Sequence, residues 1–238
     1  MSSMMCGMLL GAGVNATKTY VDDVFSTFLY RGTQSGITIN NGIDLSGEGG
    51  LVWSKSRTST DYSNHMLVDS ERGNQRLQSD DDDSQNTINS FNFSSTGYTV
   101  PGEYPSGSGI YRVNKSGIDY GSWSFRKATG FFDIVTWTGN ATLRTISHSL
   151  GSVPGLIMIK RLDTSGEWIV YHRSIGATKY LRLEATDAAG TSDNYFNDTE
   201  PTASVFTIKQ NSHVNANNGT YVAYLFADGS SKEATSRS

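Results

Sequence analysis

The chain has little cysteine, little proline and no long apolar run. Its single cysteine, Cys6, cannot form an intrachain disulfide, so cohesion must come from packing or from association with other chains. We interpret Cys6 as a buried small residue or a bystander rather than as a reactive thiol. Proline is also rare, with four residues against 25 glycines.

Positive charge is also scarce. Nineteen lysines and arginines stand against 23 aspartates and glutamates, which gives a net charge of −4 with the two signs interspersed along the chain. Such a chain has no basic field to attract nucleic acid or anionic lipid. We therefore expect neither a nucleic-acid partner nor membrane insertion.

The chain opens with an apolar stretch, Met1–Gly13, and has no Lys or Arg before Lys18. Its apolar stretch is too short for a membrane span and does not match a secretory signal. We predict that residues 1–20 are a docking segment that needs another surface to cover its apolar side chains, which are Met4, Met5, Met8, Leu9 and Leu10. At the other end, residues 229–238 form a polar tail that we expect to fray unless a neighbour holds it.

The rest of the chain has the composition of many short strands. Glycine, serine, threonine and asparagine separate short runs rich in valine, isoleucine, tyrosine, phenylalanine and tryptophan. This pattern predicts an all-β protein made of antiparallel, β-sandwich-like units of jelly-roll or lectin-like type. Only two short helical turns are expected, at Val21–Ser26 and at Asp187–Ala189.

The order of landmarks in the first half recurs in the second half. Tyr30–Gly32 (YRG) corresponds to Trp137–Gly139 (WTG), and Tyr120–Phe125 (YGSWSF) corresponds to Tyr221–Phe226 (YVAYLF). The offset between matched positions drifts from about 101 to about 108 residues, as small loop insertions would cause. We predict two tandem β repeats, residues 21–128 and 129–228.

The copies differ most in one loop. Val100 to Gly117 is about six residues longer than Ile208 to Gly219, which places an insertion in the first copy. The inserted segment, Pro101–Tyr111, is glycine-rich and carries Tyr104 and Tyr111. Because loops of this kind on a rigid scaffold commonly carry recognition, these two tyrosines are candidate binding residues.

The sequence offers no recognisable catalytic motif. No Gly-x-Ser-x-Gly turn follows a strand, and none of the four histidines has the setting of a catalytic triad. His65 and His172 fall close together when the copies are aligned, which favours packing over a role as a base. His148 is expected to support a turn. We predict that the protein is not an enzyme and needs no cofactor.

Asp80–Asp83 is the densest run of charge. Carboxylates are calcium ligands, but a calcium loop normally spaces its carboxylates and places a glycine at the sharp turn. Four adjacent aspartates point in different directions and repel one another. We therefore predict a solvated loop and no metal site.

A glycosidase would need two carboxylates about 5 to 10 Å apart in a cleft. Four acidic residues are candidates for such a pair: Asp69, Glu71, Glu167 and Glu184. Their convergence cannot be derived from the sequence. A depolymerising enzyme therefore stays open as an alternative.

Three of the four tryptophans occupy strand positions where the other copy has Met158, Tyr224 or Tyr30; they are Trp53, Trp123 and Trp137. We interpret these three as core or sheet-face residues. Trp168 follows a turn beside Gly166 and is expected to be the free one. It joins Tyr104 and Tyr111 as a candidate binding residue.

Several long strings resemble a known family. The first copy contains Asp22–Thr27 (DDVFST), Asn41–Trp53 (NGIDLSGEGGLVW) and Asp69–Gly73 (DSERG). The second copy contains Ile146–Gly155 (ISHSLGSVPG), Trp168–Gly176 (WIVYHRSIG) and Gly219–Tyr224 (GTYVAY). These strings resemble an uncharacterised domain family of tail-fibre and other virion proteins from marine bacteriophages, especially short-tailed phages of cyanobacteria and other ocean bacteria. The resemblance covers about residues 20–228.

The resemblance implies a structural or adhesive role in the phage particle and supplies no catalytic residues. We expect a virion protein, assembled in the host cytoplasm, that docks on other virion proteins through residues 1–20. It would act as a tail fibre or fibre-like appendage, associate as a homotrimer and contact a glycan or protein of the host surface. A head-decoration or tail-adaptor protein without receptor binding is the first alternative, and a carbohydrate-binding or depolymerising protein is the second.

Overall fold

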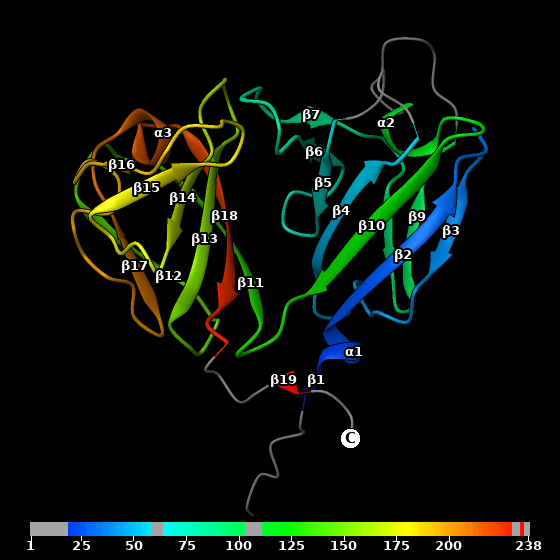
Figure 1. The fold of residues 1–238 in the computed structure, drawn as a ribbon, viewed down its shortest axis with the longest axis horizontal. Coiled ribbons are helices and arrows are strands. Elements are labelled where there is room, and N and C mark those ends of the chain that lie inside the picture. Colours follow the sequence, from blue (N-terminus) through cyan, green and yellow to red (C-terminus); the bar gives the residue numbers. More distant parts are fainter. Residues whose placement is uncertain (1–18, 59–63, 103–110, 230–233, 236–238) are drawn as a thin grey trace, which may run out of the picture.

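The computed structural model describes residues 19–58, 64–102, 111–229 and 234–235, which form two lobes (Figure 1). The lobes consist almost entirely of antiparallel strands arranged in several sheets, so the predicted all-β, sandwich-like fold is confirmed. The helices within the described residues have four residues each. None of them is long and apolar enough to cross a membrane.

The first lobe packs a six-stranded sheet on a three-stranded sheet. The order of the larger sheet is β2-β10-β4-β5-β6-β7, and that of the smaller is β3-β9-β8. The elements of this lobe in chain order are β2 Phe25–Arg31, β3 Ile37–Asn40, β4 Gly50–Ser56, β5 Met66–Asp69, β6 Gln75–Leu77, β7 Asn86–Thr87, β8 Asn92–Ser94, β9 Gly97–Val100, α2 Tyr111–Asn114 and β10 Asp119–Arg126.

The second lobe repeats this strand order. Its sheets are β11-β18-β13-β14-β15-β16 and β12-β17, which match those of the first lobe strand for strand apart from β8. Its elements are β11 Phe132–Thr138, β12 Arg144–Ser147, β13 Pro154–Arg161, β14 Ile169–His172, β15 Lys179–Arg182, β16 Gly190–Thr191, β17 Val205–Ile208, α3 Ser212–Asn215 and β18 Thr220–Ala227.

A stacked aromatic pair occupies the same place in both lobes. The rings of Tyr30 and Tyr120 lie 5.2 Å apart in the first lobe, and those of Trp137 and Tyr221 lie 5.3 Å apart in the second. Tyr30 and Trp137 each donate a hydrogen bond to a backbone carbonyl of the neighbouring short helix, α2 or α3. The pairs therefore fix the helices over the ends of the sandwich cores.

A glycine follows the first aromatic residue by two positions in each lobe, and packing explains it. A Cβ on Gly32 would lie 2.1 Å from the carbonyl oxygen of Lys115, and one on Gly139 would lie 2.1 Å from that of Ala216. No side chain fits so close to a backbone oxygen. The matching Tyr-Arg-Gly and Trp-Thr-Gly strings thus mark the same close approach of two chain segments.

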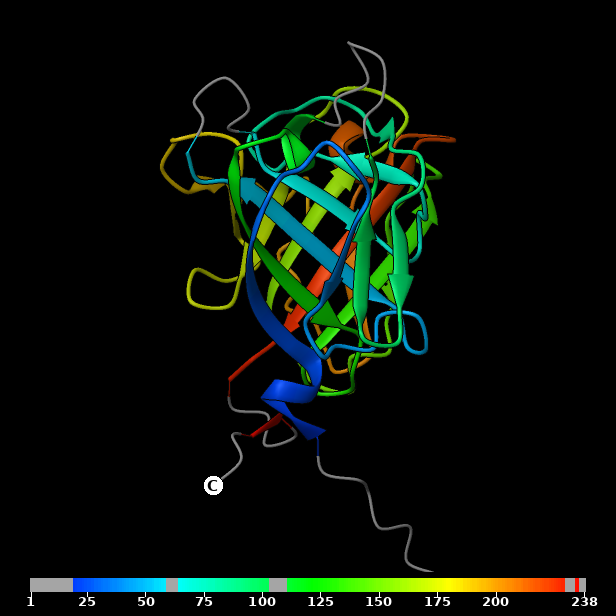
Figure 2. The same cartoon turned by 90° about the vertical axis from the view of Figure 1, so that its right-hand side faces the viewer.

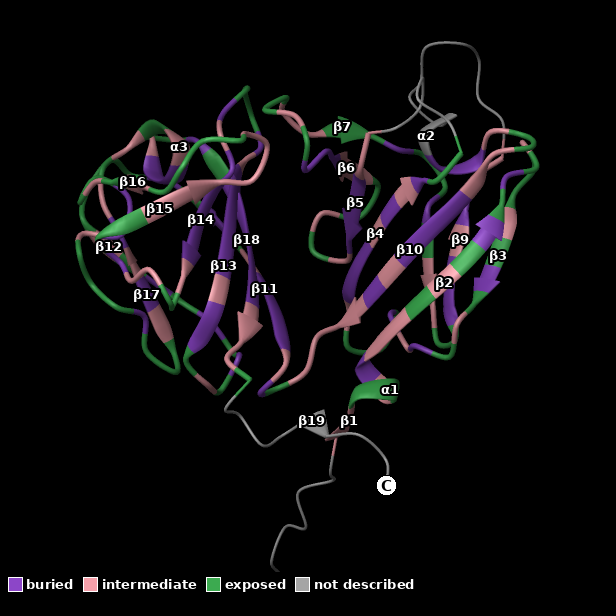
Figure 3. Ribbon diagram, viewed as in Figure 1, coloured by how far each residue is buried: buried purple, intermediate pink, exposed green. Residues whose placement is uncertain are grey.

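Each lobe has its own buried apolar core, and a third buried cluster contains residues from both six-stranded sheets. Figure 3 colours the strands of both sheets by burial. From the second lobe the third cluster contains side chains of β11, β13, β14 and β18, including Ile134, Met158 and Tyr224, which are at most 4% exposed. From the first lobe its buried members come from β4, β5 and β6, whereas Leu29 on β2 is 64% exposed. The lobes therefore pack off centre and leave the β2–β10 side of the first sheet open.

Both ends of the described chain lie together. β1 (Thr19–Tyr20) pairs in parallel with β19 (Ala234–Thr235), and α1 (Val21–Val24) leads from β1 into β2. Figures 1 and 2 show β1, α1 and β19 at the end of the molecule opposite α2 and α3. The described part of the tail, Ala234–Thr235, is thus held by a neighbouring strand.

The helix predictions succeeded only in part. α1 begins at Val21, where a helical turn was expected, but it ends at Val24. The turn expected at Asp187–Ala189 is wrong, because these residues have no helical structure. α2 and α3 were not predicted.

Candidate functional site

Most of the predicted contact residues lie outside the described residues. Tyr104 is one of these, as are the docking residues Met4, Met5, Met8, Leu9 and Leu10. Tyr111 is the first residue of α2, but its side chain is not described. Among the predicted binding residues, Trp168 alone has a described side chain.

The prediction for Trp168 is wrong. The side chain is 0% exposed, and its Nε1 donates a hydrogen bond of 2.8 Å to the carbonyl oxygen of Gln78 in the first lobe. Its ring also stacks on Tyr224, with 6.2 Å between centroids. Trp168 lies in the loop between β13 and β14, and the first lobe covers it, so it serves the junction and not an external ligand.

The strand pairing also corrects the alignment of the histidines. Trp53 pairs with Leu67 across β4 and β5, and the matched pair across β13 and β14 is Met158 and Val170. His65 therefore corresponds to Trp168, and His172 corresponds to Asp69. The shared structural slot inferred for His65 and His172 does not exist.

His148 supports a turn as predicted. Its Nδ1 accepts a hydrogen bond of 3.3 Å from the backbone N–H of Leu150, and burial lowers the pKa of its imidazole. His172 likewise accepts from the backbone N–H of Ser174. Both rings thus accept hydrogen bonds from the local backbone.

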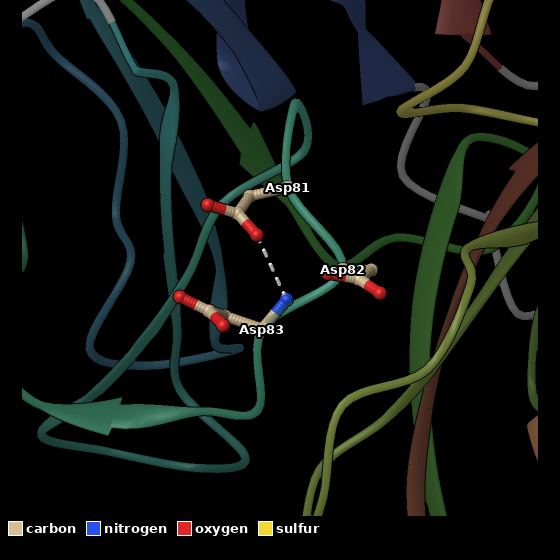
Figure 4. Close-up of side chains that lie close together, drawn as sticks. All are labelled: Asp81, Asp82 and Asp83. Atoms are coloured by element: carbon tan, nitrogen blue, oxygen red, sulfur yellow. Dashed lines mark hydrogen bonds between the residues drawn. The ribbon is translucent and has the colours of Figure 1, made fainter.

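The aspartate run lies in a loop, where Asp80, Asp82 and Asp83 are exposed and Asp81 is half-buried. One carboxylate oxygen from each of Asp81, Asp82 and Asp83 lies within 4.8 Å of the other two, and Figure 4 shows the three side chains. Asp81 Oδ1 accepts from the backbone N–H of Asp83, and its Oδ2 accepts from Gln78. The carbonyl of Asp82 accepts from the backbone N–H of Gly166 in the second lobe. The run is thus fixed as part of the junction.

A lysine ammonium is the cation beside this run. Lys160 is 0% exposed, and its Nζ donates to the carbonyl oxygens of Asp82 at 3.0 Å and of Arg161 at 3.1 Å. Burial lowers the pKa of Lys160 to about 8, and the neighbouring carboxylates oppose that shift. The acidic run therefore faces a built-in counter-charge.

The four carboxylates considered for glycoside cleavage belong to separate structural contacts. Asp69 is completely buried and paired with Arg72, and Glu71 lies 2.7 Å from Nζ of Lys127. Glu167 pairs with Arg182. Glu184 accepts from the backbone N–H of Trp168. Asp69 cannot meet a solvent-borne substrate from this position.

The strongest candidate site is a groove of about 400 Å³ on the outer face of β2, β10 and β4. In one row of neighbouring residues across the sheet, Gly121 lies between Leu29 and Lys55. In the next row, Trp123 lies between Thr27 and Trp53. The groove forms because the middle position of the first row has no side chain. Its lining residues are Thr27, Phe28, Leu29, Lys55, Ser56, Arg57, Gly121, Ser122 and Trp123.

A second hollow of about 260 Å³ adjoins the groove at Trp123 and is lined by Trp53, His65, Trp123 and Phe125. The two indoles meet edge to face with 6.4 Å between centroids. Trp53 Nε1 donates to His65 Nδ1 at 2.8 Å, and Nζ of Lys55 lies 3.1 Å from Nε2 of the same ring. Burial, followed by the charge of Lys55, lowers the pKa of His65. The site therefore holds an imidazole fixed between Trp53 and Lys55, beside two half-buried indoles.

The groove is cationic and apolar at once. Leu29 and Trp123 provide apolar surface, and Lys55 and Arg57 provide positive charge. None of the described residues that line the groove carries a carboxylate. Trp53 and Trp123 lie on a sheet face, as the sequence predicted, but they are only half-buried and line the two hollows. The signal that sequence reasoning missed is Gly121, whose counterpart in the second copy is Val222.

A family profile described as a domain of unknown function matches residues 21–235, a span that runs from α1 to β19 and includes both lobes. The chain belongs to the DUF7483 family. No curated protein matches the chain, and no solved structure matches it. For this DUF7483 chain, function must therefore be argued from the site itself.

Proposed function

We propose that this DUF7483 chain is a non-catalytic structural protein of a bacteriophage particle that contacts the host surface, as a tail fibre or fibre-like appendage does. The observation that carries the adhesive part is the contrast between the two matched sheet faces. The second lobe uses this face to bind the first lobe, whereas the first lobe keeps its β2–β10 side open, with Leu29 exposed and Trp123 half-buried. The resemblance to virion proteins of marine phages supports the particle location.

The layout of the molecule is compatible with attachment at one end and contact elsewhere. β1 and α1 lie at the end opposite α2 and α3 (Figure 2), and residues 1–18 precede β1 in the chain. We propose that residues 1–20 dock on other virion proteins, and that the chain associates as a homotrimer. Buried contacts between the lobes would let the two act as one rigid unit, which is useful in an appendage.

Two experiments test this function. An electron-microscopy map of the whole particle should contain the two-lobed shape at the tail, and its absence from the particle would refute the proposal. Purified full-length protein should bind cells of the bacterium that the phage infects and leave their surface polysaccharide intact. A position on the head or tail collar without cell binding would favour a decoration or adaptor protein, and loss of polysaccharide would favour a depolymerase.

Deletion of residues 1–20 distinguishes docking on the virion from contact with the host. Deletion of residues 1–20 should abolish incorporation into particles while the purified lobes still bind host cells. If the shortened chain enters particles at the level of the full chain, the docking assignment is wrong. Sedimentation of the full-length chain should give three times its mass of 25.9 kDa.

A further inference from the structure

We propose that the groove over Gly121 is a binding site for a carboxylate-bearing sugar of an acidic polysaccharide. In this site a sugar ring packs against the indole of Trp123, and its carboxylate pairs with the guanidinium of Arg57. The proposal deepens the adhesive function and rests on it. It assigns that function to one place and to one class of ligand.

The shape of the groove points to a ligand. Gly121 lies in the middle of β10, where glycine weakens a strand and often marks a place of close approach. Local packing does not require glycine here, because a Cβ would lie 3.6 Å from Cδ of Arg57 and 3.7 Å from Cδ2 of Leu29, which is ordinary contact. Its backbone is not in the left-handed region either. Because Gly121 has no side chain, the groove is deeper at this position.

The second lobe shows what a side chain does at this position. Val222 is the counterpart of Gly121, is 0% exposed and belongs to the cluster that joins the lobes. The same face is therefore filled where it packs against protein and hollow where it is open. A volume of about 400 Å³ lies within the range of roughly 300–1,000 Å³ typical of small-ligand sites.

The chemistry of the lining selects the ligand class. A pyranose has C–H faces that pack on an aromatic ring, and the groove presents Trp123 on one side and Leu29 on the other. Polar and charged groups are few, as expected for a site in which a small number of contacts set the orientation. The adjoining hollow at Trp53 and His65 extends the aromatic surface to a second ring.

The charge of the groove favours an acid. The whole chain carries −4, yet the groove contains Lys55 and Arg57 and no carboxylate among its described lining residues. Among the described residues, Arg57 forms no ion pair with a carboxylate, whereas Arg31 pairs with Asp119 at 3.1 Å. Arginine binds carboxylates through two parallel N–H donors. An anionic sugar therefore complements the positive charge of the groove, whereas a neutral sugar gains nothing from that charge.

The test titrates the full-length protein with a hexamer of α-1,4-linked galacturonate and with maltohexaose as the neutral control, by calorimetry and tryptophan fluorescence. We expect the uronate hexamer to bind at least 10-fold more tightly than maltohexaose, and to weaken as salt is raised. Equal affinity for both hexamers, or no binding of the uronate, would overturn the proposal.

Two substitutions and one control locate the site. Gly121→Val installs the side chain found in the second lobe and should reduce uronate affinity at least 10-fold without lowering the unfolding temperature. Arg57→Gln should reduce uronate affinity about 10-fold and leave maltohexaose binding unchanged. Lys179→Gln removes an exposed cation on β15 of the second lobe and should change nothing. Uronate binding by Gly121→Val at the wild-type level would refute the groove as the site.

Measurements of cell binding and of self-association test the sugar site over Gly121 separately from the adhesive function on which it rests. If wild type and Gly121→Val bind host cells equally, the groove is wrong and the adhesive function stands. If wild type binds the uronate hexamer but not cells, the groove stands and the adhesive function fails. If Gly121→Val instead abolishes a wild-type oligomer seen by sedimentation, the groove is an interface between copies of this chain and the sugar proposal is wrong.

Discussion

The hydroxyl of Tyr224 in the second lobe donates a hydrogen bond of 2.6 Å to Oδ2 of Asp69 in the first, and both residues are 0% exposed. Nε of Arg72 donates to the same oxygen at 2.6 Å, and the backbone N–H groups of Glu71 and Arg72 donate to Oδ1. The buried carboxylate therefore has four donors. Since one of them belongs to the other lobe, the junction is specified by polar contacts as well as by apolar packing.

The Tyr224→Phe substitution should lower the free energy of unfolding by about 1–3 kcal/mol, because Asp69 loses a donor where water cannot replace it. Urea denaturation measures the change. Tyr98→Phe is the control, since the Tyr98 hydroxyl donates to the neutral Ser122 hydroxyl within the first lobe. Its cost should be smaller, about 1 kcal/mol. A smaller loss for Tyr224→Phe than for Tyr98→Phe would argue against a specific polar junction.

The Arg72→Met substitution should cost about 3–5 kcal/mol, because it leaves the buried carboxylate of Asp69 without its charge partner. The Arg72 side chain is 4% exposed. Arg31→Met is the matched control: its pair with Asp119 is exposed, with side-chain exposures of 68% and 39%. Loss of such a surface pair should cost under about 1 kcal/mol. Equal costs in urea denaturation would contradict the assignment.

Stability should rise with pH through the range in which Lys160 loses its proton. The pKa of Lys160 is lowered by burial from 10.5 to about 8, so between these values the unfolded chain holds the extra proton. The free energy of unfolding should therefore increase from pH 8 to pH 9.5, by at most about 1.4 kcal/mol per pH unit. This contribution is lost as the pH falls through 8. Unfolding measured in Lys160→Met should lack this slope, and parallel profiles would exclude Lys160 as the cause.

Two glycines should respond to alanine in opposite directions. Gly32→Ala should destabilise the chain by about 1–3 kcal/mol, because its Cβ meets the carbonyl oxygen of Lys115 at 2.1 Å. Gly121→Ala should stabilise it by about 0.5–1 kcal/mol, because a strand interior gains from a side chain that has room. Calorimetric unfolding of both variants checks the signs. A loss of stability in Gly121→Ala would mean that packing requires this glycine.

The fold class could be read from the sequence because it depends on local pattern. Short runs with turn residues between them predict strands, and the paired strings at Tyr30–Gly32 and Trp137–Gly139 mark equivalent close approaches in the two lobes. Helices of four residues, such as α3, leave little periodic signal. The cap of α3, in which the side chain of Asn211 accepts from the backbone N–H of His213, is a weak signal in a chain rich in asparagine.

The site could not be derived in the same way, because alternation along a strand does not reveal what covers each face. The sequence predicted Trp168 to be the free tryptophan and Trp123 to be a core or sheet-face residue, yet the first lobe covers Trp168 completely and leaves Trp123 half-buried. The difference arises from the off-centre packing of the lobes, which depends on contacts more than 80 residues apart, such as Trp168 with Gln78. The contrast of Gly121 with Val222 was visible in the sequence, but its meaning required the fold.

The parallel pairing of β1 with β19 determines how the protein would bear a mechanical load. Because the two strands run in the same direction, a pull on the chain before Thr19 and after Thr235 acts on opposite ends of the pair. The hydrogen bonds between the strands are then loaded in shear, together, rather than one after another. Force acts on β2 and β18 only after β1 and β19 separate, so the two lobes carry no load while this pair is intact.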